Sequence, residues 1–250
     1  MPISILPFNS WLYRHLLLPL ICGLLLLTVL HLTQLDLVLA QWIFQQEGNT
    51  PGWSLRHNFF LEHILHNGGR HVVTLLSLTL LFTLALSFIK ASLKPWRKDL
   101  LLLLANVAIS ILLVRFAKEY TNVSCPWDIL QFGGSKPWIP FPNSLFSPMD
   151  LGQCFPGGHS SGAFAWVALY YFALHQMPSK RFRFLSFAVI LGIVFAVCQE
   201  LRGAHFLTHD LTSLLLSWVI ATLGYGVVYR PWRQRQPSTI ELPNTVAMRV

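Results

Sequence analysis

The stretch Arg202-Gly-Ala-His-Phe-Leu-Thr-His-Asp210 places an arginine, two histidines and an aspartate between two long apolar runs. Ionisable groups next to a bilayer are costly and usually mark a functional site. If the stretch is helical, Arg202, His205 and His209 share one face, because residues three and four apart are neighbours on a helix. The stretch therefore predicts a polar site held between the ends of two membrane helices.

The composition of the whole chain is typical of an integral membrane protein. Of its 250 residues, 54% are hydrophobic and only 11% are charged, whereas soluble domains carry about 25% charged residues. The formal net charge is +8, which raises the question of a nucleic-acid partner. We exclude nucleic acid, because the basic residues stand at the ends of apolar runs rather than on one polar surface.

Six apolar runs have the length or near-length of a membrane span, which takes about 20 residues. They cover residues 16–33, 71–89, 99–115, 159–177, 184–201 and 211–229. We predict an all-α, polytopic membrane protein with six transmembrane helices in a single domain over residues 1–235. Residues 236–250 are predicted to form a polar cytoplasmic tail. The first run is expected to be retained, because no small-residue cleavage pattern follows it.

The basic residues predict the orientation of these spans. Clusters follow the second, fourth and sixth runs: Lys90, Lys94, Arg97 and Lys98; Lys180, Arg181 and Arg183; Arg230, Arg233 and Arg235. Cytoplasmic loops are enriched in Lys and Arg, so both termini are expected in the cytoplasm. The connections at about 36–69, 118–158 and 202–210 are then expected on the outer side of the membrane.

The first outer connection contains aromatic residues that suit a membrane interface, where a ring meets both lipid and water. Trp42, Trp53, Phe59 and Phe60 are expected in this belt, on short helices that lie on the membrane surface. The histidines of the same segment, among them His66, are expected to be interfacial rather than ligands. The region could also form an entry for lipid.

Two of the four cysteines, Cys125 and Cys154, lie in the long second connection. An extracytoplasmic loop permits a disulfide between them, because that compartment is oxidising. The alternative is a pair of free buried thiols. Cys22 and Cys198 lie inside apolar runs and are expected to pack as small hydrophobic residues.

The segment Pro156-Gly157-Gly158 precedes a helix that is expected to begin near His159. Glycines let the backbone approach a ligand closely, and the first amides of a helix attract anions, phosphate above all. Lys118 and Arg202 can add positive charge from two other helices. Phosphoryl transfer depends mainly on positioning and on charge stabilisation, so these groups together predict a phosphate site.

Two histidines supply the chemistry for such a site. His205 can attack phosphorus and carry the phosphoryl group. His159 can act as general acid toward the leaving oxygen, since an ordinary histidine pKa of about 6.5 suits neutral pH. The arrangement requires no cofactor and no metal. The alternative is a zinc site built from His205, His209 and Asp210, because a His-x3-His pair on a helix can ligate zinc.

The three polar stretches together resemble the signature of the type 2 phosphatidic acid phosphatase superfamily. Its pattern is Lys-x6-Arg-Pro, then Pro-Ser-Gly-His, then Ser-Arg-x5-His-x3-Asp. The resemblance extends over roughly residues 70–230 and includes the number and sidedness of the spans. The matching residues are Lys118 and Pro126 in the first motif, Pro156, Gly158 and His159 in the second, and Gly203, His205, Phe206 and Thr208 in the third.

The chain also departs from the family pattern. The departures are Cys125 for the first arginine, Gly157 for the serine, Gln199 for the second arginine and His209 for the aspartate. We expect Arg202 to substitute for the second arginine from one helical turn away. His209 or Asp210 must then orient His205, and Asp128 is a third candidate. His209 has the better spacing, whereas a carboxylate better stabilises a charged imidazole.

The resemblance implies a membrane lipid phosphatase with a phosphohistidine intermediate on His205 and His159 as general acid. It also implies that Lys118, Arg202 and the amides of Gly157 and Gly158 hold the phosphate. The expected location is the bacterial inner (cytoplasmic) membrane, with the active site facing the periplasm.

The expected substrates are polyprenyl pyrophosphate, phosphatidic acid, phosphatidylglycerophosphate or a lipid A phosphate. Two alternative functions remain open. One is a lipid phosphotransferase that uses the same intermediate. The other is a catalytically inactive lipid-binding or transport protein, which the missing arginine and aspartate of the motif favour.

Overall fold

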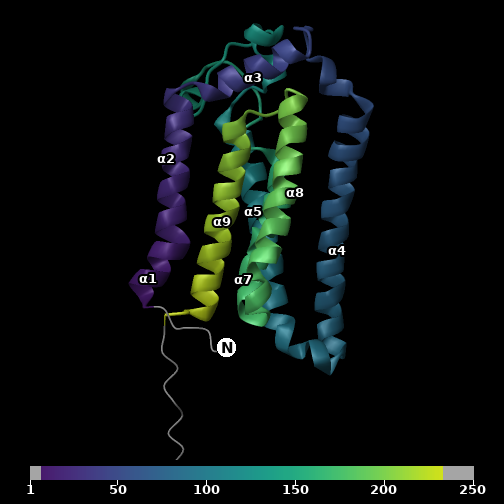
Figure 1. Ribbon diagram of the computed structural model, residues 1–250, viewed down its shortest axis with the longest axis vertical. Helices are drawn as coiled ribbons and strands as arrows, with labels where there is room; N and C mark the ends of the chain where they lie inside the picture. The colour runs from purple at the N-terminus through teal and green to yellow at the C-terminus, as the bar shows by residue number, and fades with distance from the viewer. Residues whose placement is uncertain (1–6, 233–250) are drawn as a thin grey trace, which may run out of the picture.

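The computed structural model describes residues 7–232, so the predicted polar tail at 236–250 lies outside the described residues. Within 7–232 the regular secondary structure is helical, and two isolated β-bridges are the only strand-like pairings. The α-helices of this part of the chain are α1 (Phe8–Leu12), α2 (Leu18–Leu32), α3 (Leu35–Gln46), α4 (Gly68–Ile89), α5 (Arg97–Thr121), α6 (Gly158–Phe164), α7 (Leu169–Gln176), α8 (Arg181–Leu201) and α9 (Leu207–Tyr229). The long helices α2, α4, α5, α8 and α9 run side by side, and α3 lies across one end of them (Figure 1).

Five helical segments among the described residues are long and apolar enough to cross a membrane. They are Phe8–Leu32, Phe60–Ile89, Ala91–Thr121, Pro178–Leu201 and Leu207–Tyr229. They correspond to five of the six predicted spans, and each continues into polar residues beyond its apolar run. The chain is therefore an all-helical protein with several candidate membrane spans.

The remaining predicted span, at 159–177, differs from the others. The chain is helical there, but a tighter turn at Ala165–Ala168 separates α6 from α7. This part of the chain lies at the centre of the bundle, where Ala163, Ala165 and Ala173 are each 0% exposed. Small side chains here let α5, α8 and α9 pack closely around it. Six spans and cytoplasmic termini remain predictions.

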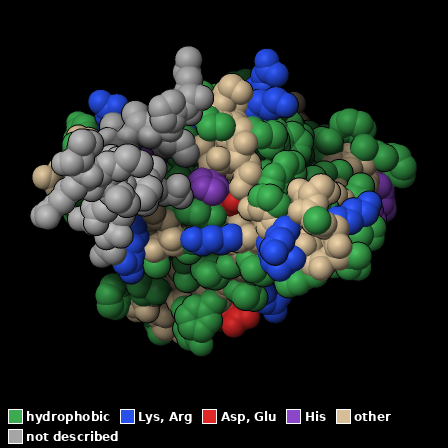
Figure 2. All heavy atoms as spheres, turned by 90° about the horizontal axis from the view of Figure 1, so that it is seen from below, with side chains coloured by type: hydrophobic (Ala, Val, Ile, Leu, Met, Phe, Trp, Pro, Cys, Tyr) green, Lys and Arg blue, Asp and Glu red, His purple; other side chains and the backbone are tan. Residues whose placement is uncertain are grey.

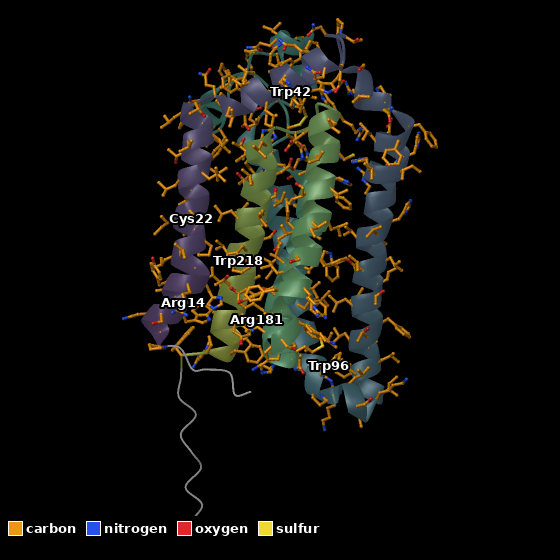
Figure 3. The ribbon with its side chains drawn as sticks, viewed as in Figure 1. Arg14, Cys22, Trp42, Trp96, Arg181 and Trp218 are labelled. Carbon is orange, nitrogen blue, oxygen red and sulfur yellow. A yellow bond between two sulfur atoms is a disulfide. The ribbon has the colours of Figure 1, made fainter. Side chains whose placement is uncertain are left out.

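The two ends of the bundle differ in composition. Lys and Arg side chains are spread over the end at which α1 begins and α9 ends, as the view from that end shows (Figure 2). Arg14 and Arg181 lie at this end, and Trp42 lies at the other (Figure 3). The end near Trp42 is covered by α3 and by the connection from α5 to α6 (Figure 1).

The covering connection has short helical turns but no long helix, and it begins at Asn122 because α5 extends to Thr121. Lys118, which the sequence placed at the start of the loop, therefore lies on the last turn of α5. Cys125 and Cys154 form a disulfide across the connection, with their Cα atoms 5.2 Å apart. The disulfide ties the start of the connection to the segment before α6.

The expectation of an aromatic interface belt is wrong for Trp53. Trp42, Phe59 and Phe60 are exposed, but Trp53 is only 2% exposed. Its Nε1 donates to the carbonyl oxygen of Leu201 at 2.7 Å. The segment that precedes α4 thus packs against the end of α8 rather than simply lying on the membrane.

We predict that replacing both Cys125 and Cys154 with serine lowers the free energy of unfolding by about 3–4 kcal/mol, because the disulfide restricts the unfolded chain. The two cysteines are 29 positions apart. Thermal unfolding in detergent, with and without reductant, measures the effect. Cys22→Ser is the control, because Cys22 is a free, exposed cysteine. Equal unfolding temperatures for the double variant and the oxidised wild type would contradict the prediction.

Candidate active site

A cavity of about 730 Å³ lies at the end of the bundle that α3 covers. We call it the polar cavity. Five of the predicted catalytic and phosphate-binding residues line it: Lys118, Gly158, His159, Arg202 and His205. They come from α5, α6 and the turn between α8 and α9, so the three separated stretches of sequence meet at one place.

His205 is hydrogen-bonded to Asp210. Its Nδ1 lies 2.7 Å from Oδ1 of Asp210, and the two residues are 7% and 2% exposed. The hydroxyl of Ser160 on α6 donates to the same carboxylate oxygen. Since the carboxylate accepts the proton on Nδ1, neutral His205 has its lone pair on Nε2. Nε2 is therefore the ring nitrogen that is left free to accept a proton or to bind a ligand.

The other two candidates for orienting His205 lie elsewhere. His209 lines a second cavity of about 540 Å³, mostly apolar, between α2 and α9. Its ring packs against Phe155 and Phe206, with ring centroids 5.4 and 5.3 Å away. Asp128 does not line the polar cavity, and its carbonyl accepts a hydrogen bond from the amide of Lys136. The geometry favours Asp210 for this role.

The stretch 202–210 is not one helix, so the expected shared helical face is wrong. α8 ends at Leu201 and α9 begins at Leu207. Gly203 has φ +68°, and the amides of Gly203 and Ala204 bond back to the carbonyls of Glu200 and Gln199. A glycine in this conformation commonly ends a helix. The tight turn brings His205 into the cavity beside Arg202.

Arg202 is buried, and its guanidinium is held on several sides. Its Nε donates to the carbonyl of Arg56 at 3.0 Å, and one terminal nitrogen donates to Oε1 of Gln199 at 3.3 Å. The other terminal nitrogen lies 3.8 Å from the carboxylate of Glu62. Arg56 and Glu62 belong to the segment between α3 and α4. That segment therefore positions the arginine of the site.

The two glycines before His159 have different roles. The amide of Gly157 donates to the carbonyl of His209 at 2.9 Å, so the expectation that this amide holds phosphate is not supported. Gly158 does line the polar cavity, and a Cβ at this position would lie 2.9 Å from Nζ of Lys118. The Lys118 ammonium group thus packs against the backbone at the start of α6.

The missing side chain at Gly157 makes room for the histidine–aspartate pair. A Cβ there would lie 2.7 Å from Oγ of Ser160 and 3.1 Å from Nδ1 of His205, and it would collide with Oδ1 of Asp210. The motif serine is therefore sterically excluded in this arrangement. Glycine at position 157 therefore leaves the space that the carboxylate of Asp210 occupies.

Further residues that the sequence analysis did not assign to the site also line the polar cavity. They include His66, Arg70, Arg115 and Gln199. The ring of His66 lies 4.3 Å from that of His159, between centroids, and its Nδ1 contacts Nε2 of Gln199. His66 thus lines the cavity, which the sequence analysis did not predict. Gln199, which stands where the family motif has an arginine, was the one feature of the sequence that indicated a difference in this part of the cavity.

Asp36 connects α3 to the start of α9. Its Oδ1 accepts the backbone amide of Thr208 at 3.0 Å, and its other oxygen accepts the hydroxyl of Thr208. Burial raises the pKa of Asp36 above its ordinary value, and the hydrogen bonds from Thr208 oppose that rise. The contact satisfies an amide in the first turn of α9, the turn that carries Asp210.

The alternative zinc site finds no support in this geometry. Among residues 7–232, no group of three or more His, Cys, Asp or Glu side chains is placed to hold a metal ion. His205 and Asp210 face each other, but the ring of His209 lies 6.1 Å from that of His205 and lines the second cavity.

These features define a helical membrane protein with a buried histidine–carboxylate pair beside lysine and arginine. The model of the PAP2 superfamily matches residues 99–233, more than half of the chain. The chain belongs to the PAP2 superfamily, which confirms the resemblance seen in the three motifs.

The fold is similar to that of a solved structure described as the first transmembrane PAP2-type phosphatidylglycerolphosphate phosphatase from Bacillus subtilis. The two chains are 18% identical, with a TM-score of 0.54. The likeness covers 84% of this chain and 94% of the other. No curated protein matches this sequence.

We predict that Gly157→Ala destabilises the protein by about 1–3 kcal/mol, the usual cost of overpacking, because the new methyl group displaces Asp210 from His205. Gly162→Ala is the matched control. A Cβ at Gly162 would lie 3.6 Å from Val73, which is ordinary contact. Thermal unfolding of both variants in detergent checks this, and equal stability of the two would contradict it.

Proposed function

We propose that the protein is a membrane lipid phosphatase that removes phosphate from a lipid phosphate or pyrophosphate through a phosphohistidine on His205. The observation that carries the proposal is the polar cavity, which brings Lys118, His159, Arg202 and His205 together. Membership of the PAP2 superfamily supports the same reaction class.

In the first step, Nε2 of His205 attacks phosphorus, and the bond between phosphorus and the lipid oxygen breaks. His159, whose protonated form is favoured by the negative charge of the bound phosphate, donates its proton to the leaving oxygen. Asp210 stabilises the positive charge that develops on His205, because it holds Nδ1. Lys118 and Arg202 balance the negative charge on the phosphoryl oxygens, which is the main requirement of phosphoryl transfer.

In the second step, water attacks phosphorus, and the phosphorus–nitrogen bond breaks with its electron pair returning to Nε2. Neutral His159 accepts one proton from the water, which restores its acidic form. Inorganic phosphate then leaves. A lipid hydroxyl in place of water would give a phosphotransferase, and the two reactions differ only in this acceptor.

The proposed orientation puts the polar cavity on the periplasmic side of the bacterial inner membrane. The Lys- and Arg-rich end of the bundle supports this, because cytoplasmic ends are enriched in these residues (Figure 2). The disulfide between Cys125 and Cys154 lies at the opposite end and is consistent with an oxidising compartment.

We predict that the purified protein releases phosphate from at least one of the four expected substrates, and that His205→Ala abolishes release. The loss follows because alanine at position 205 leaves no imidazole nitrogen to accept the phosphoryl group. Phosphate release from polyprenyl pyrophosphate, phosphatidic acid, phosphatidylglycerophosphate and a lipid A phosphate in detergent micelles measures it. Transfer of label to a second lipid would indicate the phosphotransferase. Equal rates for wild type and His205→Ala would refute the proposal.

We predict that Asp210→Asn lowers kcat by about 10²- to 10⁴-fold, because an amide neither fixes the tautomer of His205 nor stabilises its charge. His209→Asn is the matched comparison and is expected to change kcat by less than about tenfold, since the His209 side chain lines the second cavity. Steady-state kinetics with the lipid that the wild type hydrolyses fastest measure kcat for both variants. The reverse order of effects would show that His209 orients His205.

A further inference from the structure

Gln199 is buried on the inner face of α8, where the family motif has an arginine. It is 2% exposed and lines the polar cavity. Its Oε1 accepts a hydrogen bond from Arg202 at 3.3 Å, and its Nε2 contacts Nδ1 of His66. Gln199 therefore links a cation from one side of the cavity to a histidine from another.

The partners of Gln199 fix the proton on His66. Arginine can only donate, so the amide oxygen of Gln199 must face Arg202 and the amide nitrogen must face His66. Nδ1 of His66 then accepts a hydrogen bond from Gln199. A neutral imidazole with an acceptor at Nδ1 carries its proton on Nε2. Gln199 thus turns His66 into a hydrogen-bond donor at Nε2.

The surroundings of His66 direct this donor to the polar cavity. The residue lines the cavity, and its ring packs on that of His159. Nε2 of His66 has no hydrogen-bond partner within residues 7–232. The atom is nevertheless not fully buried. It is therefore an accessible donor next to the general acid.

We propose that Nε2 of His66 donates a hydrogen bond to a non-bridging oxygen of the bound phosphate. Arg202 and His66, joined by Gln199, together take over what a single arginine at position 199 supplies in the motif. The ligand class is a phosphate monoester or diphosphate, and the inference rests on the proposed phosphatase function. His66 is a substrate-binding residue in this scheme and not the nucleophile.

His66→Phe tests this directly, because phenylalanine keeps a ring against His159 but has no donor. A hydrogen bond to a charged group is worth about 10- to 100-fold in binding. We expect kcat/KM to fall, and the inhibition constant for inorganic phosphate to rise, by about that factor. The control is His63→Phe. His63 lies three positions before His66, its side chain is exposed, and it does not line the cavity.

A second pair of variants separates the effect of the hydrogen-bond donor from the effect of side-chain packing. Glutamine and asparagine carry the same amide, but it reaches the ε position in glutamine and the δ position in asparagine. We expect His66→Gln to bind inorganic phosphate at least threefold more tightly than His66→Asn. The two variants are compared only if thermal unfolding in detergent gives them the same unfolding temperature.

Two results would overturn the assignment of His66. One is a His66→Phe variant with wild-type kcat/KM and wild-type inhibition by phosphate. The other is equal phosphate inhibition of the Gln and Asn variants. Both results require that the wild-type enzyme is active. If the wild type instead releases phosphate no faster than His205→Ala, the proposed phosphatase function fails.

Discussion

The hydrogen bond between His205 and Asp210 is the constraint on which the other features of the site depend. It joins the turn after α8 to the first turn of α9, and both partners are buried. A buried carboxylate is tolerated only when it is hydrogen-bonded and paired. The hydroxyl of Ser160 and the imidazole of His205 meet that requirement at Oδ1, whereas Oδ2 is buried without a hydrogen-bond partner among residues 7–232.

Several departures from the family motif follow from this one contact. Asp210 stands one position later than the motif aspartate, and the turn at Gly203 lets it reach His205 across the start of α9. The carboxylate then occupies the space beside the Cα atom of residue 157, where a serine side chain would collide with it. The two substitutions therefore fit one another and need not indicate a decayed site.

The sequence predicted the helical membrane fold and the meeting of three polar stretches, because apolar length and motif order are local properties. It did not reveal which neighbour orients His205, since spacing on an assumed helix favoured His209 and the real backbone turns at Gly203. Nor did it reveal His66 or the buried Trp53, because their partners on α8 are more than 130 positions away. Contacts of that range leave no periodic pattern in the chain.

The attachment of the segment before α4 to the end of α8 bears on how this chain can diverge. Trp53 fills the space against Gly203, and Arg56 and Glu62 hold the guanidinium of Arg202. Those three residues precede the matched segment at 99–233. The segment that carries the family motifs is thus not an autonomous module, and exchange of the first third of the chain between relatives requires compensating changes at the end of α8.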